Sequence, residues 1–122
     1  MSELGKRLWV FADGDLPPPG DKEPKGHEAL TITNLNAAEA TVLLDLYFED
    51  RDPVLGIPIK VGGRRVSCLR LDKPLGPEGY RIPYGQYSLA LRCDLPVVAV
   101  FGRLDVRQNN LAYYSVAGFS SD

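Results

Sequence analysis

A period of two in the apolar residues is the feature that most constrains the fold of this chain. In residues 28–34, Leu30 and Ile32 fall on one side of an extended strand, and threonines fall on the other. Because successive side chains of a strand point to opposite faces, this spacing predicts strands with one face in a core. Proline or glycine separates most of the apolar runs. The alanine and leucines of residues 40–50 could also belong to a helix, but Val42, Tyr47 and Phe48 favour a strand. The runs with the alternation are residues 6–12, 28–34, 40–50, 86–93 and 96–106.

Residues 56–71, GIPIKVGGRRVSCLRL, contain two short apolar runs that flank Gly62 and Gly63. Because glycine takes the positive φ angles of a tight turn, we predict a hairpin here. A last apolar run covers residues 110–118. The pattern predicts one domain, residues 1–122, with about eight strands. We therefore predict an all-β, single-domain antiparallel β-sandwich of jelly-roll-like topology.

The longest irregular stretch of the sequence is residues 13–27, which contain three consecutive prolines. Such a run favours an extended conformation and cannot pair inside a sheet. Long loops of compact domains are usually either functional or disordered, and the sequence leaves both readings open.

Charge, cysteine content and the lack of long apolar runs narrow the possible partners and the cellular compartment. The formal net charge is −2, which argues against a dedicated nucleic-acid binder, because such proteins carry a strong basic excess. Cys68 and Cys93 lie in strand-like runs without a CxxC spacing, so we expect two buried, reduced thiols and no zinc knuckle or disulfide. No run resembles a signal peptide or approaches the roughly 20 apolar residues of a membrane span. We therefore expect a soluble, cytoplasmic protein.

His27 is the only histidine of the chain and precedes Glu28. Such a pair can perform acid–base chemistry or contribute to a metal site. A metal site normally needs three or four ligands, however, and no cluster has metal-ligand spacing. The favoured alternative is a histidine that begins a strand and bonds to a loop. Since no catalytic motif occurs elsewhere, we expect neither an enzyme nor a bound metal or cofactor.

Arginines lie in or beside most of the expected strands. They pair well with carboxylates and phosphates. One interpretation is that they pair across neighbouring strands with aspartates on wet sheet faces, each pair contributing less than about 1 kcal/mol. The other is that some of them line a subunit interface or a ligand groove. The arginines are Arg64, Arg65, Arg70, Arg81, Arg92, Arg103 and Arg107, and the aspartates are Asp45, Asp72, Asp94 and Asp105.

The segment GRLDVRQ, residues 102–108, favours the second interpretation. Its charged residues continue one face of a strand. The first part of that face is too apolar to be exposed to solvent. A face that is apolar at one end and charged at the other is typical of a protein contact with a dry core and a polar edge. We predict that Arg103 and Arg107 flank Asp105, hold it ionised and leave donors for a neighbouring subunit or a bound anion. The predicted zone, shared between subunits of a homo-oligomer, is Arg103, Asp105, Arg107 and Gln108, after an apolar start of Val97, Ala99 and Phe101.

Several short strings occur in an order that is typical of one family. The most specific are RLWVFADGDLPP at 7–18 and DLPVVAVFGRLDVRQ at 94–108. The others are HE at 27–28, an asparagine at 34, EDRDPV at 49–54, RR at 64–65, RLD at 70–72, IP at 82–83 and LAYYSVA at 111–117. Together they resemble the family of the Anabaena sensory rhodopsin transducer over nearly the whole chain.

The resemblance implies a β-sandwich that assembles as a homotetramer and has no enzymatic role. The family's named member is a cytoplasmic partner of a light-sensing membrane protein, and DNA contact and carbohydrate-like ligands have been proposed for the family. The implied partners are therefore further copies of this chain, a membrane photoreceptor or another signalling protein, and a carbohydrate or an anion. DNA contact is not supported by the net charge of −2.

Two functions remain open. The first is a binding and signalling module that acts as a homo-oligomer. The second is a small-ligand binding protein, in which Trp9 or a tyrosine supplies an apolar platform for a carbohydrate or anion and polar side chains supply directional hydrogen bonds. The candidate ligand or interface residues are Trp9, His27, Glu28, Arg65, Arg70, Asp72, Arg103, Asp105, Arg107 and Gln108.

Overall fold

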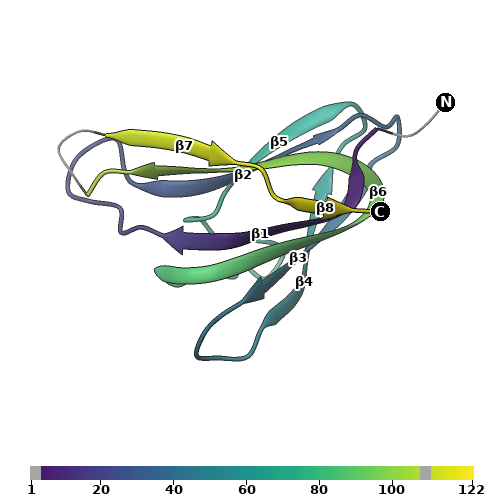
Figure 1. Ribbon diagram of the computed structural model, residues 1–122. Helices are drawn as coiled ribbons and strands as arrows, with labels where there is room; N and C mark the ends of the chain where they lie inside the picture. Colours follow the sequence, from purple (N-terminus) through teal and green to yellow (C-terminus); the bar gives the residue numbers. More distant parts are fainter. Residues whose placement is uncertain (1–3, 108–110) are drawn as a thin grey trace.

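The computed structural model of the chain describes residues 4–107 and 111–122. These residues form eight strands and no helix, which confirms the predicted all-β architecture (Figure 1). Accordingly, the described part of the chain contains no helix that could cross a membrane. The strands are β1 (Lys6–Leu16), β2 (His27–Asn34), β3 (Ala40–Tyr47), β4 (Val54–Val61), β5 (Arg65–Arg70), β6 (Gly85–Asp105), β7 (Ala112–Val116) and β8 (Phe119–Ser121).

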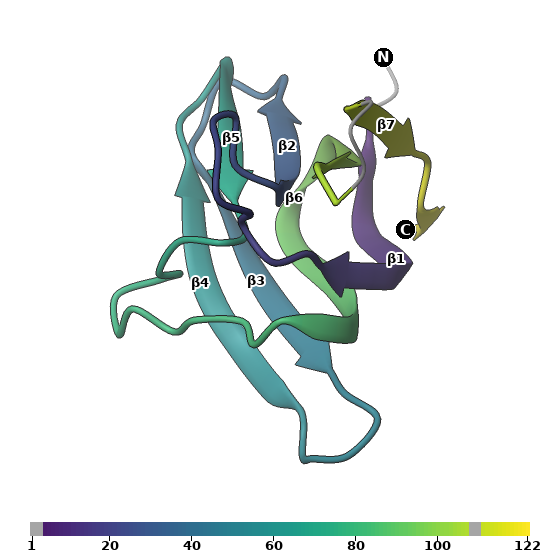
Figure 2. The same ribbon diagram turned by 90° about the vertical axis from the view of Figure 1, so that its left-hand side faces the viewer.

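The strands form two antiparallel sheets that share β6. The first sheet has the order β4-β3-β6-β1-β8. The second has the order β5-β2-β6-β7. The first half of β6 pairs with β1 and β3, and its second half pairs with β2 and β7. The curved ribbon of β6 in Figures 1 and 2 carries the chain from one sheet into the other.

The continuity of β6 corrects the sequence prediction of two separate strands, 86–93 and 96–106. The 21 residues of β6 form one strand. Pro96 lies between Cys93, the last partner of β3, and Val98, the first partner of β2. Its missing N–H therefore falls where the chain passes between sheets, and Pro96 does not interrupt the strand.

The predicted hairpin around Gly62 and Gly63 is wrong. β4 pairs with β3 in the first sheet, whereas β5 pairs with β2 in the second, so the turn connects the two sheets. The positive φ of this turn, 54°, belongs to Arg64 and not to a glycine. Gly63 is required for another reason, because a Cβ at this position would overlap the carbonyl oxygen of Ala37.

The two ends of the predicted strand pattern also differ from the structure. β1 continues to Leu16, so it includes the first residues of the stretch 13–27 that the sequence predicts to be irregular. The predicted strand 110–118 is instead β7, and β8 follows it after two residues. β8 pairs with Leu8–Val10 of β1, so the C-terminal tail extends the first sheet.

The core lies between the inner faces of the two sheets. The rings of Trp9, Phe11 and Phe101 stack through it, with centroid separations of 6.3 and 5.8 Å. Val97, Ala99 and Phe101 of β6 are buried in this core. The apolar face that precedes Arg103 is therefore a core face, and the predicted subunit contact does not lie on it.

Candidate functional site

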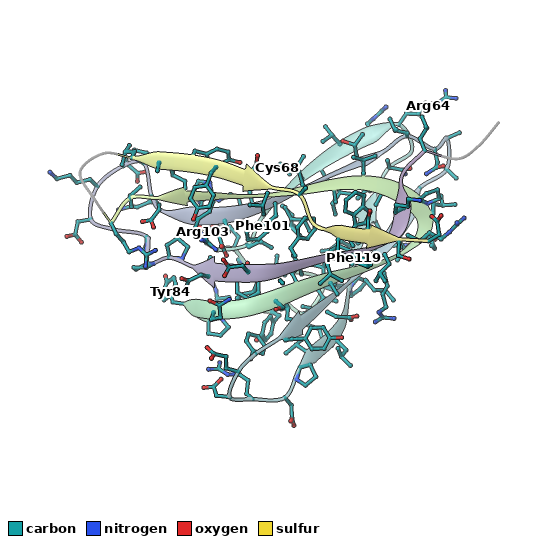
Figure 3. All side chains as sticks on the ribbon, viewed as in Figure 1. Arg64, Cys68, Tyr84, Phe101, Arg103 and Phe119 are labelled. Carbon is teal, nitrogen blue, oxygen red and sulfur yellow. The ribbon has the colours of Figure 1, made fainter. Side chains whose placement is uncertain are left out.

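A cluster of buried polar side chains joins the two sheets at one end of the sandwich. Glu28 of β2 and Arg103 of β6 form a salt bridge of 2.7 Å between Oε2 and Nε, and their side chains are 0% and 10% exposed. The hydroxyl of Tyr87, in the other half of β6, donates to Oε1 of Glu28 at 2.6 Å. Tyr114 of β7 accepts a hydrogen bond of 2.6 Å from Nη1 of Arg103. Figure 3 shows Arg103 pointing between the sheets.

The same ion pair covers an edge of β1. Nη2 of Arg103 donates to the carbonyl of Asp13 at 2.9 Å, and Oε2 of Glu28 accepts from the N–H of Asp15 at 3.0 Å. β8 pairs with β1 only at Leu8–Val10 and does not reach these groups. The two side chains thus take the place of a neighbouring strand, since buried backbone groups need partners.

Burial and hydrogen bonding fix the protonation states within the cluster. Burial, with the charge of Glu28, raises the pKa of Tyr87 far above its ordinary value of 10.0, so Tyr87 remains a neutral donor. Burial acts to lower the pKa of Arg103, but its hydrogen bonds to Glu28 and Tyr114 outweigh this and raise it. Every buried side-chain nitrogen and oxygen in the described part of the chain has a hydrogen-bond partner. The cluster is therefore built to hold the sheets together.

The structure separates the residues that were predicted to form one charged zone. Asp105 forms its ion pair with Arg107 at the surface, with 2.6 Å between Oδ2 and Nη2. This hydrogen bond is the main reason that the pKa of Asp105 falls from 3.8 to about 2. The predicted contact between Arg107 and Asp105 is present, whereas Arg103 pairs with Glu28 and contributes little to the lowered pKa of Asp105. Gln108 lies outside the described residues.

The other predicted charged residues form local pairs. Arg70 binds Asp72 through two hydrogen bonds of 2.8 and 2.7 Å. Arg92 binds the buried Asp45 in the same way, at 2.6 and 2.8 Å. Arg65 donates to the carbonyl of Arg64. The pair of Asp45 with Arg92 joins neighbouring strands, as the first interpretation expects. Asp72 and Asp105 instead pair with an arginine two residues away in sequence, and Asp94 accepts from the N–H of Thr41.

Trp9 and His27 have structural partners. Nε1 of Trp9 donates to the carbonyls of Lys6 and Val97, both at 3.1 Å, and its partly buried indole packs against the core, so it is not a free platform. His27 begins β2, and its Nδ1 lies 2.9 Å from the carbonyl of Lys25, as in the favoured alternative. The described residues contain no group of three histidine, cysteine, aspartate or glutamate side chains that could hold a metal.

The outer side of the second sheet is apolar and exposed. Val66, Thr33 and Val98 form one row across β5, β2 and β6, and Cys68, Thr31 and Val100 form the next. On β7, Tyr113 lies over Gly102, where a Cβ would meet the Tyr113 hydroxyl. The exposed fractions of Val66, Val98, Val100 and Tyr113 are 63%, 43%, 40% and 63%. We call these residues, namely Thr31, Thr33, Val66, Cys68, Val98, Val100 and Tyr113, the outer apolar face.

The exposure of this face corrects one sequence expectation and adds residues that the sequence did not indicate. Cys68 is exposed, whereas a buried thiol was expected; Cys93 is partly buried. Both cysteines are free thiols in the structure, as predicted. Val98 and Val100 alternate with the equally apolar Val97 and Ala99, so the sequence pattern does not show which side of β6 faces the core.

A polar groove lies at the tip of the β3–β4 loop. It has a volume of about 370 Å³, and its lining includes Phe48, Glu49, Asp50, Arg51, Tyr84 and Gln86. The guanidinium of Arg51 stacks over the Phe48 ring at 5.2 Å, and Tyr84 is 64% exposed. An exposed aromatic ring beside acids and an amide is an arrangement that can bind a small polar ligand. Figure 3 shows Tyr84 near one end of the first sheet.

The fold and these surfaces define a small antiparallel β-sandwich protein. Residues 4–120 match the family described as the Anabaena sensory rhodopsin transducer, and the chain belongs to this family. The solved structure of Thermotoga maritima 1070 is 30% identical, with a TM-score of 0.85 and 97% of each chain covered. The structure of the Anabaena sensory rhodopsin transducer is 28% identical, with a TM-score of 0.74, and the match covers 88% of this chain and 96% of that one. No curated protein gives a significant match.

Proposed function

We propose that this protein is a non-enzymatic binding and signalling module that acts as a homo-oligomer in the cytoplasm, without a cofactor. The observation that carries the proposal is the outer apolar face. One face of an antiparallel sheet can be solvated, and it is then usually polar. Here β-branched and aromatic side chains are exposed together, and such patches usually mark interaction sites.

The arrangement of charge around the outer apolar face supports a contact between copies. The face itself carries no lysine, arginine, aspartate or glutamate. Arg70, paired with Asp72, lies at one end of β5 beyond it. An apolar centre with charged residues at its edge is the usual composition of a subunit interface. A homotetramer, as the family resemblance implies, is the assembly we propose.

The state of the candidate acid–base residues supports a non-enzymatic role. Glu28 accepts hydrogen bonds from Asp15, Tyr87 and Arg103, so its carboxylate is engaged within the fold. A general base must have an accessible lone pair within reach of a substrate proton. Glu28 is fully buried, so its carboxylate has no such access to a substrate.

The family suggests the kind of partner. One similar structure is named as a sensory rhodopsin transducer, and we propose that this chain, too, contacts a membrane photoreceptor or another signalling protein. Light scattering over a dilution series tests the oligomer: the expected mass is a multiple of 13.4 kDa. A mass of one chain at all concentrations would contradict it. Affinity capture from membranes of the source organism tests the proposed partner. The expected result is capture of an identified photoreceptor.

A second candidate function is binding of a small carbohydrate or anion in the groove beside Tyr84. Its exposed ring offers a platform for a sugar, and Arg51, which is paired with Asp50, can offer a hydrogen bond to the ligand. A carbohydrate array and a thermal-shift screen test this function. The expected result is a ligand that raises the melting temperature of the wild type but not of Tyr84→Ala. A ligand that stabilises both proteins equally would place its site elsewhere.

A further inference from the structure

The C-terminal segment, residues 111–122, is held by strand pairing rather than by burial. All five residues of β7 are exposed, and β8 has only three residues. Tyr113 is 63% exposed and Phe119 is 68% exposed. We call residues 111–122 the arm. Because so little of its surface is buried, release of the arm removes few apolar side chains from the core.

The arm binds one edge of each sheet. β7 pairs with Phe101–Asp105 of β6, and β8 pairs with Leu8–Val10 of β1. Among the described residues, β8 is the edge strand on one side of the first sheet, and β7 is the edge strand on one side of the second. Figure 1 shows β7 on the second sheet and β8 on the first, joined by a short crossing segment. Without the arm, both sheets would expose unpaired edges, and such edges bind other strands.

The crossing segment lies over an apolar slot between the sheets. The slot has a volume of about 310 Å³, and Phe11, Phe101, Val116 and Phe119 are among the residues that line it. Gly118 contacts its wall so closely that a Cβ would lie 2.6 Å from the Phe11 ring. The body of the sandwich is therefore shaped to accept this particular chain segment.

Two side-chain contacts join the arm to the rest of the sandwich, which we call the body. Tyr114 binds Arg103, and the guanidinium lies 5.5 Å from its ring centroid. Asp122 pairs with Lys6 at 3.2 Å. An arm from a second copy carries the same side chains and can make the same contacts with the same body. The complementarity seen within one chain thus applies equally between two chains.

We propose that copies of this chain exchange their arms, so that β7 and β8 of one copy complete the two sheets of another. Exchange of an identical element is a low-cost way to join subunits, because the contacts are those already made within one chain. The occupant of the two edges is then the arm of a second copy. This inference rests on the proposed homo-oligomer, and it assigns to the arm the role of locking that oligomer.

A disulfide test between β1 and β8 separates exchange from intrachain pairing. Val10 and Phe119 are direct partners across the two strands, and antiparallel partners lie within disulfide reach. All variants carry Cys68→Ser and Cys93→Ala. One chain carries Val10→Cys, another carries Phe119→Cys, and the two are co-expressed with different affinity tags. Because each chain has a single cysteine, a Val10–Phe119 disulfide can form only between chains.

Arm exchange predicts a mixed disulfide that moves about half of the protein, the share expected from random association of the two chains, from 13.4 kDa to about twice that mass on a non-reducing gel. As a matched control, Lys60→Cys replaces an exposed residue of β4 and, paired with Phe119→Cys, should give no such band. A third variant with both Val10→Cys and Phe119→Cys in one chain should also become a covalent dimer.

Two results would overturn the exchange. One is a double variant that crosslinks but keeps the mass of a single chain, and the other is the absence of any Val10–Phe119 crosslink. Light scattering of the uncrosslinked wild type is measured alongside. An oligomer whose arms crosslink within each chain contradicts the exchange alone, whereas a single-chain mass contradicts the proposed homo-oligomer as well.

Discussion

Glu28 and Arg103 face each other across the second sheet, with 2.7 Å between Oε2 and Nε and almost no contact with solvent. The same two side chains bind backbone groups of Asp13 and Asp15 in the first sheet. One ion pair thus connects the two sheets and covers the part of β1 that β8 does not reach. Its stabilising role depends on both partners being present, because a lone buried charge is costly.

Replacement of Arg103 tests this role. Arg103→Ala leaves the carboxylate of Glu28 buried without its counter-ion, so we expect the free energy of unfolding to fall by about 3–5 kcal/mol. Arg107→Ala removes the exposed partner of Asp105 and should cost less than about 1 kcal/mol. Urea unfolding of both variants measures the difference. If the two midpoints shift equally, the buried pair is not a major support of the fold.

Tyr87 should make the protein sensitive to alkali. Its pKa is raised in the folded state, whereas an unfolded tyrosine loses its proton near pH 10. The stability that Tyr87 contributes is therefore complete below about pH 10 and declines as the pH rises above it, by about 1.4 kcal/mol per pH unit. We expect the free energy of unfolding to fall more between about pH 9 and pH 11 in the wild type than in Tyr87→Phe. Parallel curves for the two proteins would contradict a buried, neutral Tyr87.

The titration of Asp105 should depend on Arg107. In the wild type, its carboxyl should titrate at a pKa of about 2, because Arg107 donates to the carboxylate. In Arg107→Ala, the pKa should return toward the ordinary value of 3.8. Carboxyl chemical shifts in an NMR titration measure both values. A low pKa that survives the substitution would mean that another group holds Asp105 ionised.

The sequence predicted where most of the strands lie, but it did not predict that β6 is one strand, where β1 ends, or all of the pairings. Alternation located the strands around Leu30 and Ile32 because it depends only on which side chains are apolar. It did not predict that the strands beside Gly63 join different sheets, because pairing is decided by contacts between distant segments. For the candidate site, the sequence indicated Glu28 and Arg103 but not that they bind each other, since 75 positions separate them.

The outer apolar face was missed for a related reason. β6 is apolar on both sides over Val97–Val100, so a period of two cannot assign the core side there. A shift of one residue moves every side chain to the opposite face. The burial of Val97 and Ala99 and the exposure of Val98 and Val100 in the folded structure establish that the latter two face outward.

Gly63 should be intolerant of any side chain. A Cβ there would overlap the carbonyl oxygen of Ala37, which belongs to the backbone and cannot move aside easily. We expect Gly63→Ala to lower the free energy of unfolding by about 3 kcal/mol or more. At neighbouring Gly62 a Cβ would meet the flexible side chain of Arg65 at 3.3 Å, so Gly62→Ala should cost about 1 kcal/mol or less. Equal melting temperatures for the two variants would contradict the close approach at Ala37.

The central claim is that the outer apolar face joins copies of this chain, and light scattering on Val98→Lys/Val100→Lys tests it most directly. Both valines are exposed in the single chain, so lysines there leave the core intact but place charges in the contact. Leu55→Lys, at an exposed position of β4, is the matched control. The wild type and Leu55→Lys should have the same mass, a multiple of 13.4 kDa. The double variant should have a smaller mass than the wild type at the same concentration, because the charged face no longer joins copies. A double variant that keeps the wild-type mass on dilution would contradict the claim.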